Sequence, residues 1–273
     1  MRVRRVEVRR AAGRRRLRFL AWSAVALVLV VAAMVATRTA LLDVDRLVIV
    51  GAMETEPAVV LDAVGIALGD PLVELDLGGA GQRVARLPWV AEASVTKGWD
   101  GTVTIRVAER TAVAAVAAMP VGAPGEASSG ETAAPAAWSV VDGSGRVLDV
   151  RADAPAGLPR LEGVTPAGAP GSNLADDADA VLRAAVALPA PLAATVTSIV
   201  LSDGNARSLA VGEVELVLAD GAVIRLGPAT DLADKLVAAA TVIERQPNQS
   251  GCVEVLDVRV PASPALTPRA DCA

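Results

Sequence analysis

The chain has 273 residues and a net charge of -5, which is long enough to bury one large core or two small ones. Hydrophobic residues make up 53% of it but aromatic residues only 2%, so any core must be built from small and branched aliphatic side chains. The sequence contains no histidine, which excludes Ser-His and Cys-His nucleophile pairs and HExxH zinc sites. We therefore expect a protein that is not an enzyme, with no cofactor and no metal.

The charge is distributed unevenly along the chain. Residues 1–18 carry nine arginines and one acid, so the remainder is strongly acidic. Residues 19–37 contain no charge and, as a helix, would span about 28 Å, close to the hydrocarbon thickness of a bilayer. We predict a transmembrane helix at 19–37 and a cytoplasmic tail at 1–18, since basic flanks stay on the cytoplasmic side.

The competing interpretation of this segment is a cleaved signal peptide. The apolar stretch is longer than a typical signal-peptide core, and Thr37, Arg38 and Thr39 form a poor small-residue cleavage site. An uncleaved anchor is therefore favoured. The tail arginines then need no nucleic acid partner, because each gains about 1 kcal/mol beside anionic lipid.

A change in composition divides the part that follows the predicted anchor. Residues 119–137 are rich in Pro, Gly, Ser and Ala and have no apolar periodicity, which is typical of a flexible segment. Ordered segments are expected on both sides, at 43–116 and 138–261. The segment 119–137 is interpreted as an inserted loop between two strands, 113–118 and 138–141.

The first ordered part has the predicted order strand, helix, helix and two strands. These elements are expected at residues 44–50, 56–64, 81–87, 89–99 and 102–109. Thr55 is the predicted N-cap of the first helix and Gly65 its end. Asp100 and Gly101 are the signal for a two-residue type I′ turn between the last two strands.

The second ordered part is predicted to be a mixed α+β domain with a mainly antiparallel sheet. Two strands around a Gly-rich turn are expected at 138–148, and a second Asp-Gly turn at Asp220 and Gly221. The further elements are helices at 173–188 and 231–245 and strands at 196–201, 209–219, 222–226 and 253–260. Residues 262–273, rich in Pro and Ala, are predicted to be a disordered tail.

Several motifs of these two parts resemble one known family. They are LDVDRLVIVGA, GIALGDPLVELD, the series LPWVAEASVTKGWDGTVTIRVAERTAVA and the later LPRLEGV. Together with the preceding anchor, they resemble the FtsQ family of bitopic cell-division proteins, also called DivIB. The resemblance implies a POTRA domain of order β-α-α-β-β at 43–112 and a β domain at 113–261. Asp100, and Thr111 with Ala112, stand where the family usually has proline.

Two further patterns suggest chemistry but have simpler explanations. Ser94 and Lys97 match the S-x-x-K pattern of penicillin-binding enzymes, but that motif needs a helix and these residues lie in a predicted strand, on opposite faces. Asp176, Asp177 and Asp179 lack the Gly and the closing Glu of a calcium loop. Acids at a helix N-terminus explain them without a cation.

The two cysteines, Cys252 and Cys272, both fall on the extracytoplasmic side of the predicted topology, where disulfides can form. A bridge between them would close a loop of about 20 residues and stabilise the fold by about 3 kcal/mol. The alternative, that the tail is loose and both thiols are reduced, stays open.

The last predicted strand, 253–260, is the candidate partner-binding site. It ends before Pro261, which is typical of a sheet edge, and an exposed edge can accept a strand from a partner. Alternation places Leu256, Val258 and Val260 toward the core and Val255, Asp257 and Arg259 outward. The predicted partner-binding residues are Val255, Leu256, Asp257, Val258, Arg259 and Val260, and the family resemblance points to the same C-terminal strand.

The resemblance implies a function in cell division. The expected protein is a non-enzymatic divisome scaffold in the cell membrane at the septum, with its N-terminus in the cytoplasm. It would bind FtsB/FtsL-type coiled-coil proteins and help to recruit septal cell-wall synthesis proteins. The alternative is a membrane-anchored POTRA-type chaperone or translocation module for exported polypeptides. The single POTRA copy favours the first function, since translocation proteins usually carry several.

Overall fold

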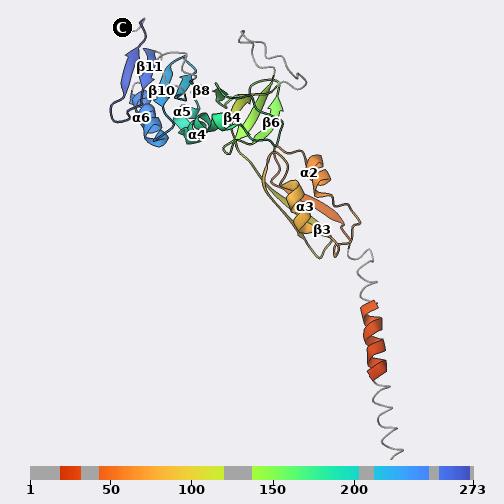
Figure 1. Cartoon of the computed structure of the whole chain (residues 1–273). Coiled ribbons are helices and arrows are strands. Elements are labelled where there is room, and N and C mark those ends of the chain that lie inside the picture. Colours follow the sequence, from red (N-terminus) through yellow and green to blue (C-terminus); the bar gives the residue numbers. More distant parts are fainter. Residues whose placement is uncertain (1–18, 32–42, 120–136, 203–211, 246–251, 271–273) are drawn as a thin grey trace, which may run out of the picture. The chain divides into compact units, whose positions relative to one another are not determined.

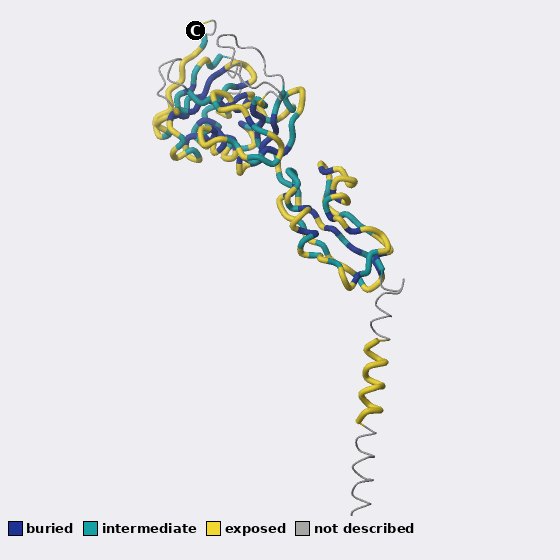
Figure 2. The backbone as a smooth tube through the Cα atoms, turned by 45° about the vertical axis from the view of Figure 1, so that its right-hand side comes forward, coloured by how far each residue is buried: buried dark blue, intermediate teal, exposed yellow. Residues whose placement is uncertain are grey.

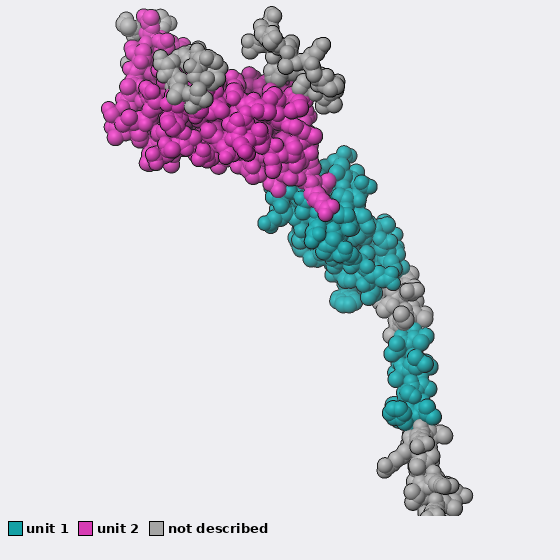
Figure 3. Space-filling view, viewed as in Figure 1, with its two compact units in different colours: residues 1–85, 90–109 teal, residues 86–89, 110–273 magenta. Residues whose placement is uncertain are grey.

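The computed structural model describes residues 19–31, 43–119, 137–202, 212–245 and 252–270. The chain divides into two compact units, which are coloured separately in Figure 3. Unit 1 contains residues 1–85 and 90–109, and unit 2 contains residues 86–89 and 110–273.

Part of the predicted anchor is visible. Residues 19–31 are helical, while residues 32–37 of the predicted span lie outside the described residues, as does the tail 1–18. In the described part of the chain, no helix combines the length and the apolar character needed to cross a membrane.

Unit 1 has the predicted element order β-α-α-β-β (Figure 1). Its elements are β1 (Arg46–Val50), α2 (Pro57–Val64), α3 (Leu77–Val84), β2 (Val90–Lys97) and β3 (Thr102–Glu109). The sheet order is β1-β3-β2, with β1 parallel and β2 antiparallel to the central strand β3. Val103, Ile105 and Val107 alternate along β3 and are buried, so this strand forms the apolar centre of the unit (Figure 2).

Both helices of unit 1 differ from prediction at their first turns. The prediction of Thr55 as N-cap is wrong, because Glu56 holds the cap position of α2. Its end at Gly65, with φ of 60°, is confirmed. Helix α3 starts at Leu77, four positions before the predicted residue 81, because the Asp76 side chain caps it by accepting from the Gly79 amide at 2.9 Å.

The segment that connects β1 to α2 is stabilised by a carboxylate at the end of β3. Glu109 accepts hydrogen bonds from the backbone amides of Met53, Glu54 and Thr55, at 2.8–3.1 Å. Burial raises the pKa of Glu109, but the amides of Glu54, Thr55 and Met53 outweigh burial and hold the pKa below its usual value. Three amides before α2 therefore have their partner on a strand distant in sequence.

The turn at Asp100 and Gly101 is part of a three-residue loop, so its type I′ prediction is wrong. In the β2–β3 hairpin the Gly98 amide donates to Thr102 O at 2.7 Å, and Gly101 has φ of +78°. Asp100 keeps a negative φ and accepts from the Thr102 amide at 3.3 Å. The side chain of Asp favours this local bond over the left-handed backbone that a type I′ turn requires of it.

Unit 2 is built on one nine-stranded sheet, in the order β12-β11-β10-β9-β8-β7-β4-β5-β6. Its strands are β4 (Ala112–Ala117), β5 (Trp138–Asp142), β6 (Val147–Arg151), β7 (Arg160–Glu162), β8 (Val196–Leu201), β9 (Val214–Leu218), β10 (Val223–Gly227), β11 (Val253–Asp257) and β12 (Ala265–Pro268). Its helices are the 3-10 turn η2 (Asp176–Ala178), α4 (Asp179–Ala187), α5 (Ala190–Ala193) and α6 (Leu232–Arg245). Five strand pairs are antiparallel and three are parallel, as a mixed but mainly antiparallel sheet requires.

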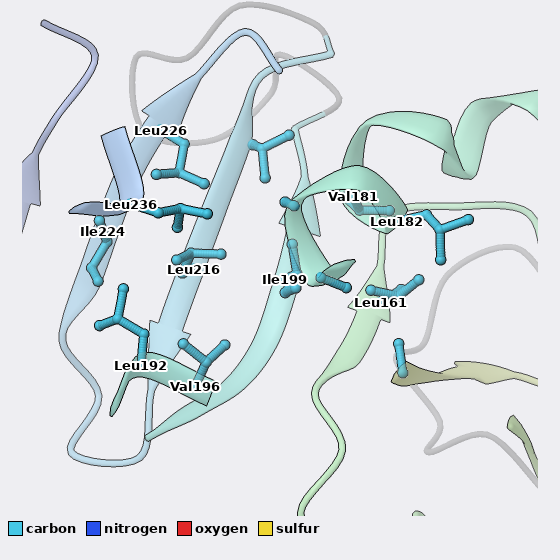
Figure 4. Packing of buried hydrophobic residues seen from close by; sticks show 14 of the residues in the cluster. Leu161, Val181, Leu182, Leu192, Val196, Ile199, Leu216, Ile224, Leu226 and Leu236 are labelled. Atoms are coloured by element: carbon cyan, nitrogen blue, oxygen red, sulfur yellow. The ribbon is translucent and has the colours of Figure 1, made fainter. Parts of the chain in front are cut away.

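The core of unit 2 is made of aliphatic side chains, as the composition predicts. Figure 4 shows Leu236 of α6 among Leu216, Ile224 and Leu226 of β9 and β10, and Val181 of α4 beside the strands that carry Leu161 and Ile199. These residues are at most 2% exposed. The two helices therefore fix the sheet through branched aliphatic contacts without any aromatic side chain.

The C-terminal region differs most from prediction. The strand expected at 253–260 ends at Asp257, and Val260 is 61% exposed and does not face the core. The disordered tail predicted at 262–273 is wrong for its described part, because Ala265–Pro268 forms β12, which pairs antiparallel with β11. The helix predicted at 173–188 is also shorter, since α4 starts only at Asp179.

The Glu109 contacts give a first testable prediction. Replacing Glu109 by Gln should lower the free energy of unfolding of unit 1 by about 1 kcal/mol at neutral pH, because charge-assisted acceptors bind amides more strongly. Since the folded pKa is depressed, the advantage of Glu is present above the unfolded value near 4.5 and is lost as pH falls through the folded pKa. Urea unfolding of the full chain in detergent, followed by circular dichroism across this pH range, measures it.

Glu92→Gln is the matched control, since Glu92 is an exposed carboxylate on the neighbouring strand β2. A difference between wild type and Glu109→Gln that stays constant down to acidic pH would contradict this role of the carboxylate.

Candidate partner-binding edge

Strand β11 has neighbours on both sides and is not the edge that was predicted. It pairs parallel with β10, Leu256 opposite Ile224, and antiparallel with β12, Leu256 opposite Leu266. The Val258 amide extends the first pairing by donating to Arg225 O at 3.0 Å. The expectation that β11 offers free backbone groups is therefore wrong, and an incoming strand has to pair elsewhere.

The six predicted contact residues separate into two groups. Leu256 and Val258 are at most 1% exposed, so their side chains are closed to a partner. Val255 and Asp257 are partly exposed, and Arg259 and Val260 are exposed. Of these, Val255 and Asp257 pair with Thr267 and Ala265 of β12, whose four residues are all exposed.

The two ends of the nine-stranded sheet differ in how they are closed. At the β6 end, Val147 exchanges backbone hydrogen bonds of 2.8 Å with Gly171 and Ser172, so a loop covers the start of the strand. Farther along, Asp149 accepts from the Val150 amide at 2.8 Å and pairs with Arg151 at 3.0 Å. Loop cover and a charged side chain on the edge are devices that prevent strand addition.

The β12 end lacks these devices within the described residues. Arg269 donates its amide inward to Cys252 O at 2.8 Å, and inward and outward amides alternate in an antiparallel ladder. Because the Arg269 amide points toward β11, the amide of Leu266 points away from β11, to the open side of the sheet. The amide of residue 268 would point the same way, but this residue is a proline and has no amide to donate. This edge therefore presents one outward amide together with the outward carbonyls.

An apolar hollow lies beside this edge. Its volume is about 230 Å³, and Leu266 of β12 forms part of its wall. The other lining residues are Thr195, Leu218, Ala219, Asp220, Ala222, Ile224, Val242, Ile243, Val253 and Leu256. A hollow lined by aliphatic side chains can accept an apolar side chain from a segment that pairs with β12.

An ion pair orders the turn between β11 and β12. Arg259 contacts both carboxylate oxygens of Asp257, at 2.6–3.1 Å, and its amide donates to the same carboxylate at 3.0 Å. The Arg259 guanidinium lowers the pKa of Asp257 more than burial raises it. Arg259 therefore forms an intramolecular contact with Asp257. Its replacement would disturb the turn as well as any contact with a partner.

Arg269 holds β12 in place, and a disulfide-bonded cysteine directly precedes β11. Cys252 is disulfide-bonded, and Cys272, the only other cysteine of the sequence, lies outside the described residues. Arg269 donates from Nε to Val253 O at 3.2 Å and from Nη2 to Asp220 O. Sequence reasoning missed β12, although the expected Cys252–Cys272 bridge was a signal that the tail stays close to β11.

The other candidate patterns have structural roles. Ser94 and Lys97 lie in strand β2, and Lys97 Nζ donates to Leu72 O. Asp177 accepts from the Thr165 amide and hydroxyl, both at 2.7 Å, and the Thr165 hydroxyl lowers its pKa more than burial raises it. Within the described ranges, no three Cys, Asp or Glu side chains are grouped to hold a metal ion.

The β-α-α-β-β unit followed by a sheet-based unit defines a protein of the POTRA-plus-β-domain class. Two family models agree: the FtsQ-type POTRA domain matches residues 42–110, and the C-terminal domain of cell division protein FtsQ/DivIB matches residues 134–259. The chain belongs to the FtsQ/DivIB family of cell-division proteins.

Individual relatives of the chain are FtsQ proteins. The chain is 28% identical to cell division protein FtsQ of Streptomyces collinus over 94% of this chain and 90% of that protein. It is 36% identical to FtsQ of Corynebacterium glutamicum, in a match that covers 26% of this chain and only 32% of that protein. A solved extracytoplasmic domain of DivIB from Geobacillus stearothermophilus aligns with 50% of this chain and 97% of that one, at 20% identity and a TM-score of 0.33, a likeness too low to support conclusions.

The disulfide at Cys252 gives a second prediction. Replacing Cys252 by Ser should lower the free energy of unfolding of unit 2 by about 3 kcal/mol, because the bridge restricts a loop of about 20 residues in the unfolded chain. If the bridge runs to Cys272, as the sequence predicts, the same variant should also raise amide hydrogen exchange in β12, which lies between the two cysteines. Hydrogen exchange and urea unfolding measure both effects.

Cys272→Ser should have the same effect, and the double variant should lose no further stability. Unequal losses in the two single variants would show that the two cysteines act independently.

Proposed function

We propose that this protein is a non-enzymatic scaffold of the division machinery that binds FtsB/FtsL-type coiled-coil proteins through the β12 edge. Bound there, the partners would help to recruit septal cell-wall synthesis proteins. The observation that carries the proposal is the contrast between the two sheet ends: β6 is covered and charged, whereas β12 is exposed and presents outward backbone groups.

The proposed recognition is strand addition. A partner segment would pair with the outward carbonyls and the Leu266 amide, which supplies affinity independent of its sequence. Specificity would come from the hollow beside Leu266 and from the accessible side chains Val255, Asp257, Arg259 and Val260 of the originally predicted site. Both matching family models are FtsQ types, which favours this function over the translocation alternative.

The proposal includes membrane anchoring. Residues 19–37 would cross the membrane once, with the arginine-rich residues 1–18 in the cytoplasm and both units outside it. Its support is the uncharged stretch of the sequence and the helical conformation of residues 19–31. Anchoring would keep the β12 edge in the compartment where septal wall synthesis takes place.

A third prediction separates main-chain pairing from side-chain contact. Leu266→Pro removes the outward amide of β12 and should weaken binding to the coiled-coil pair about tenfold, the equivalent of roughly 1.4 kcal/mol for a lost backbone bond. Leu266→Ala keeps the amide and removes only the side chain in the hollow. Pull-down and titration calorimetry with the full chain and the partners of the same organism measure both variants.

Asp149→Ala on the opposite edge is the matched control and should bind as the wild type does. Circular dichroism must show that each variant is folded. If folded Leu266→Pro binds the partners as tightly as the wild type does, the assignment of the binding site to the β12 edge is wrong.

A further inference from the structure

One end of unit 1 carries large apolar side chains that are exposed to solvent. Leu68 is 65% exposed, Val73 54% and Trp99 88%. Trp99 is the first residue of the three-residue loop between β2 and β3, directly before Asp100 and Gly101. An exposed cluster of this kind on a small domain marks an interaction surface.

Backbone hydrogen bonds tie this apolar end to the first residues of the unit. Asp45 and Arg46 donate their amides to Gly101 O, at 2.8 and 3.2 Å. Val44 donates to Asp70 O and accepts from Gly69, both at 2.9 Å. The hairpin tip and the loop that follows α2 are therefore both held at the point where the chain enters unit 1.

Two of the exposed apolar side chains at this end line the same hollow. Val73 and Trp99 line a common hollow of about 140 Å³, together with Leu72 and the stem of Lys97. Lys97 closes this arrangement by donating from Nζ to Leu72 O. The indole is thereby positioned beside aliphatic groups and still directed to solvent.

The length of chain before unit 1 limits how far this end can lie from the proposed anchor. Only residues 38–42 separate the uncharged stretch 19–37 from Asp43. At no more than about 3.5 Å per residue, this connection reaches roughly 20 Å from the end of the span. The Trp99 hairpin tip is therefore confined to a narrow zone above the membrane surface.

We propose that the Trp99 hairpin tip inserts into the headgroup layer of the membrane that anchors the chain. Tryptophan is enriched at this interface because its ring is apolar and its N-H can bond to headgroups or water. The tip would give unit 1 a second attachment beside the span and so restrict its orientation. This inference rests on the proposed anchoring of residues 19–37.

The charges around the tip indicate which lipids it needs. Asp43, Asp45, Asp70 and Asp100 outnumber Arg46 and Lys97 at this end. Anionic headgroups would repel this surface, so insertion must be driven by the burial of apolar groups. Binding to zwitterionic phosphatidylcholine vesicles is therefore expected, with little dependence on salt.

Tryptophan fluorescence of the full chain tests the proposal. The chain has four tryptophans, so single-tryptophan variants are made by replacing the others with Phe and are reconstituted in phosphatidylcholine vesicles. The Trp99 variant should show blue-shifted emission and quenching by lipids that carry a quencher near the headgroup. The Trp22 variant reports the anchor and should be quenched by lipids labelled in the upper part of the acyl chains, because Trp22 lies about 4.5 Å along the helix from the start of the span.

Met53 provides the matched control. It is 91% exposed and lies beyond the opposite end of β1, so a tryptophan placed there by Met53→Trp, with Trp99→Phe, should emit as in water. Water-like emission from Trp99 while Trp22 is quenched would overturn the inference and leave the anchor intact. Loss of quenching at Trp22 would overturn the anchor, and the inference with it.

Discussion

A sheet must end at two strands, and the outer backbone groups of those strands need partners from water, from the protein or from another chain. In unit 2 the outer backbone groups at the two ends of the nine-stranded sheet have different partners. A loop and Asp149 occupy the groups of β6, whereas β12 is a four-residue strand with every residue exposed. The proposed partner site, its hollow and the role of the disulfide all depend on where the sheet ends.

Elements with clear local signals were predictable from the sequence. The alternation Val103, Ile105 and Val107 predicted the central strand of unit 1, and Gly65 the end of its first helix. Strand β12 was not predictable in this way, because Ala265–Pro268 is short, contains a proline and becomes a strand only by pairing with β11. The edge was consequently predicted one strand too early, at residues 253–260, which contain β11.

Contacts between residues distant in sequence account for the other differences. Glu109 accepts hydrogen bonds from the backbone amides before α2, and no sequence pattern around Thr55 could indicate this contact. Asp100 directs its carboxylate to Thr102 and so selects a three-residue loop over the type I′ turn. Within the candidate site, side-chain alternation identified Leu256 and Val258 as buried but failed at Val260, because the strand ends before it.

Photo-crosslinking in dividing cells tests the central claim most directly. A photoreactive amino acid placed at residue 266 on β12 is compared with the same group at residue 149 on β6, in the full-length protein. The account predicts a crosslink to an FtsB/FtsL-type partner from residue 266 and none from residue 149. A crosslink to that partner from residue 149 alone would show that the sheet recruits its partner at the other end.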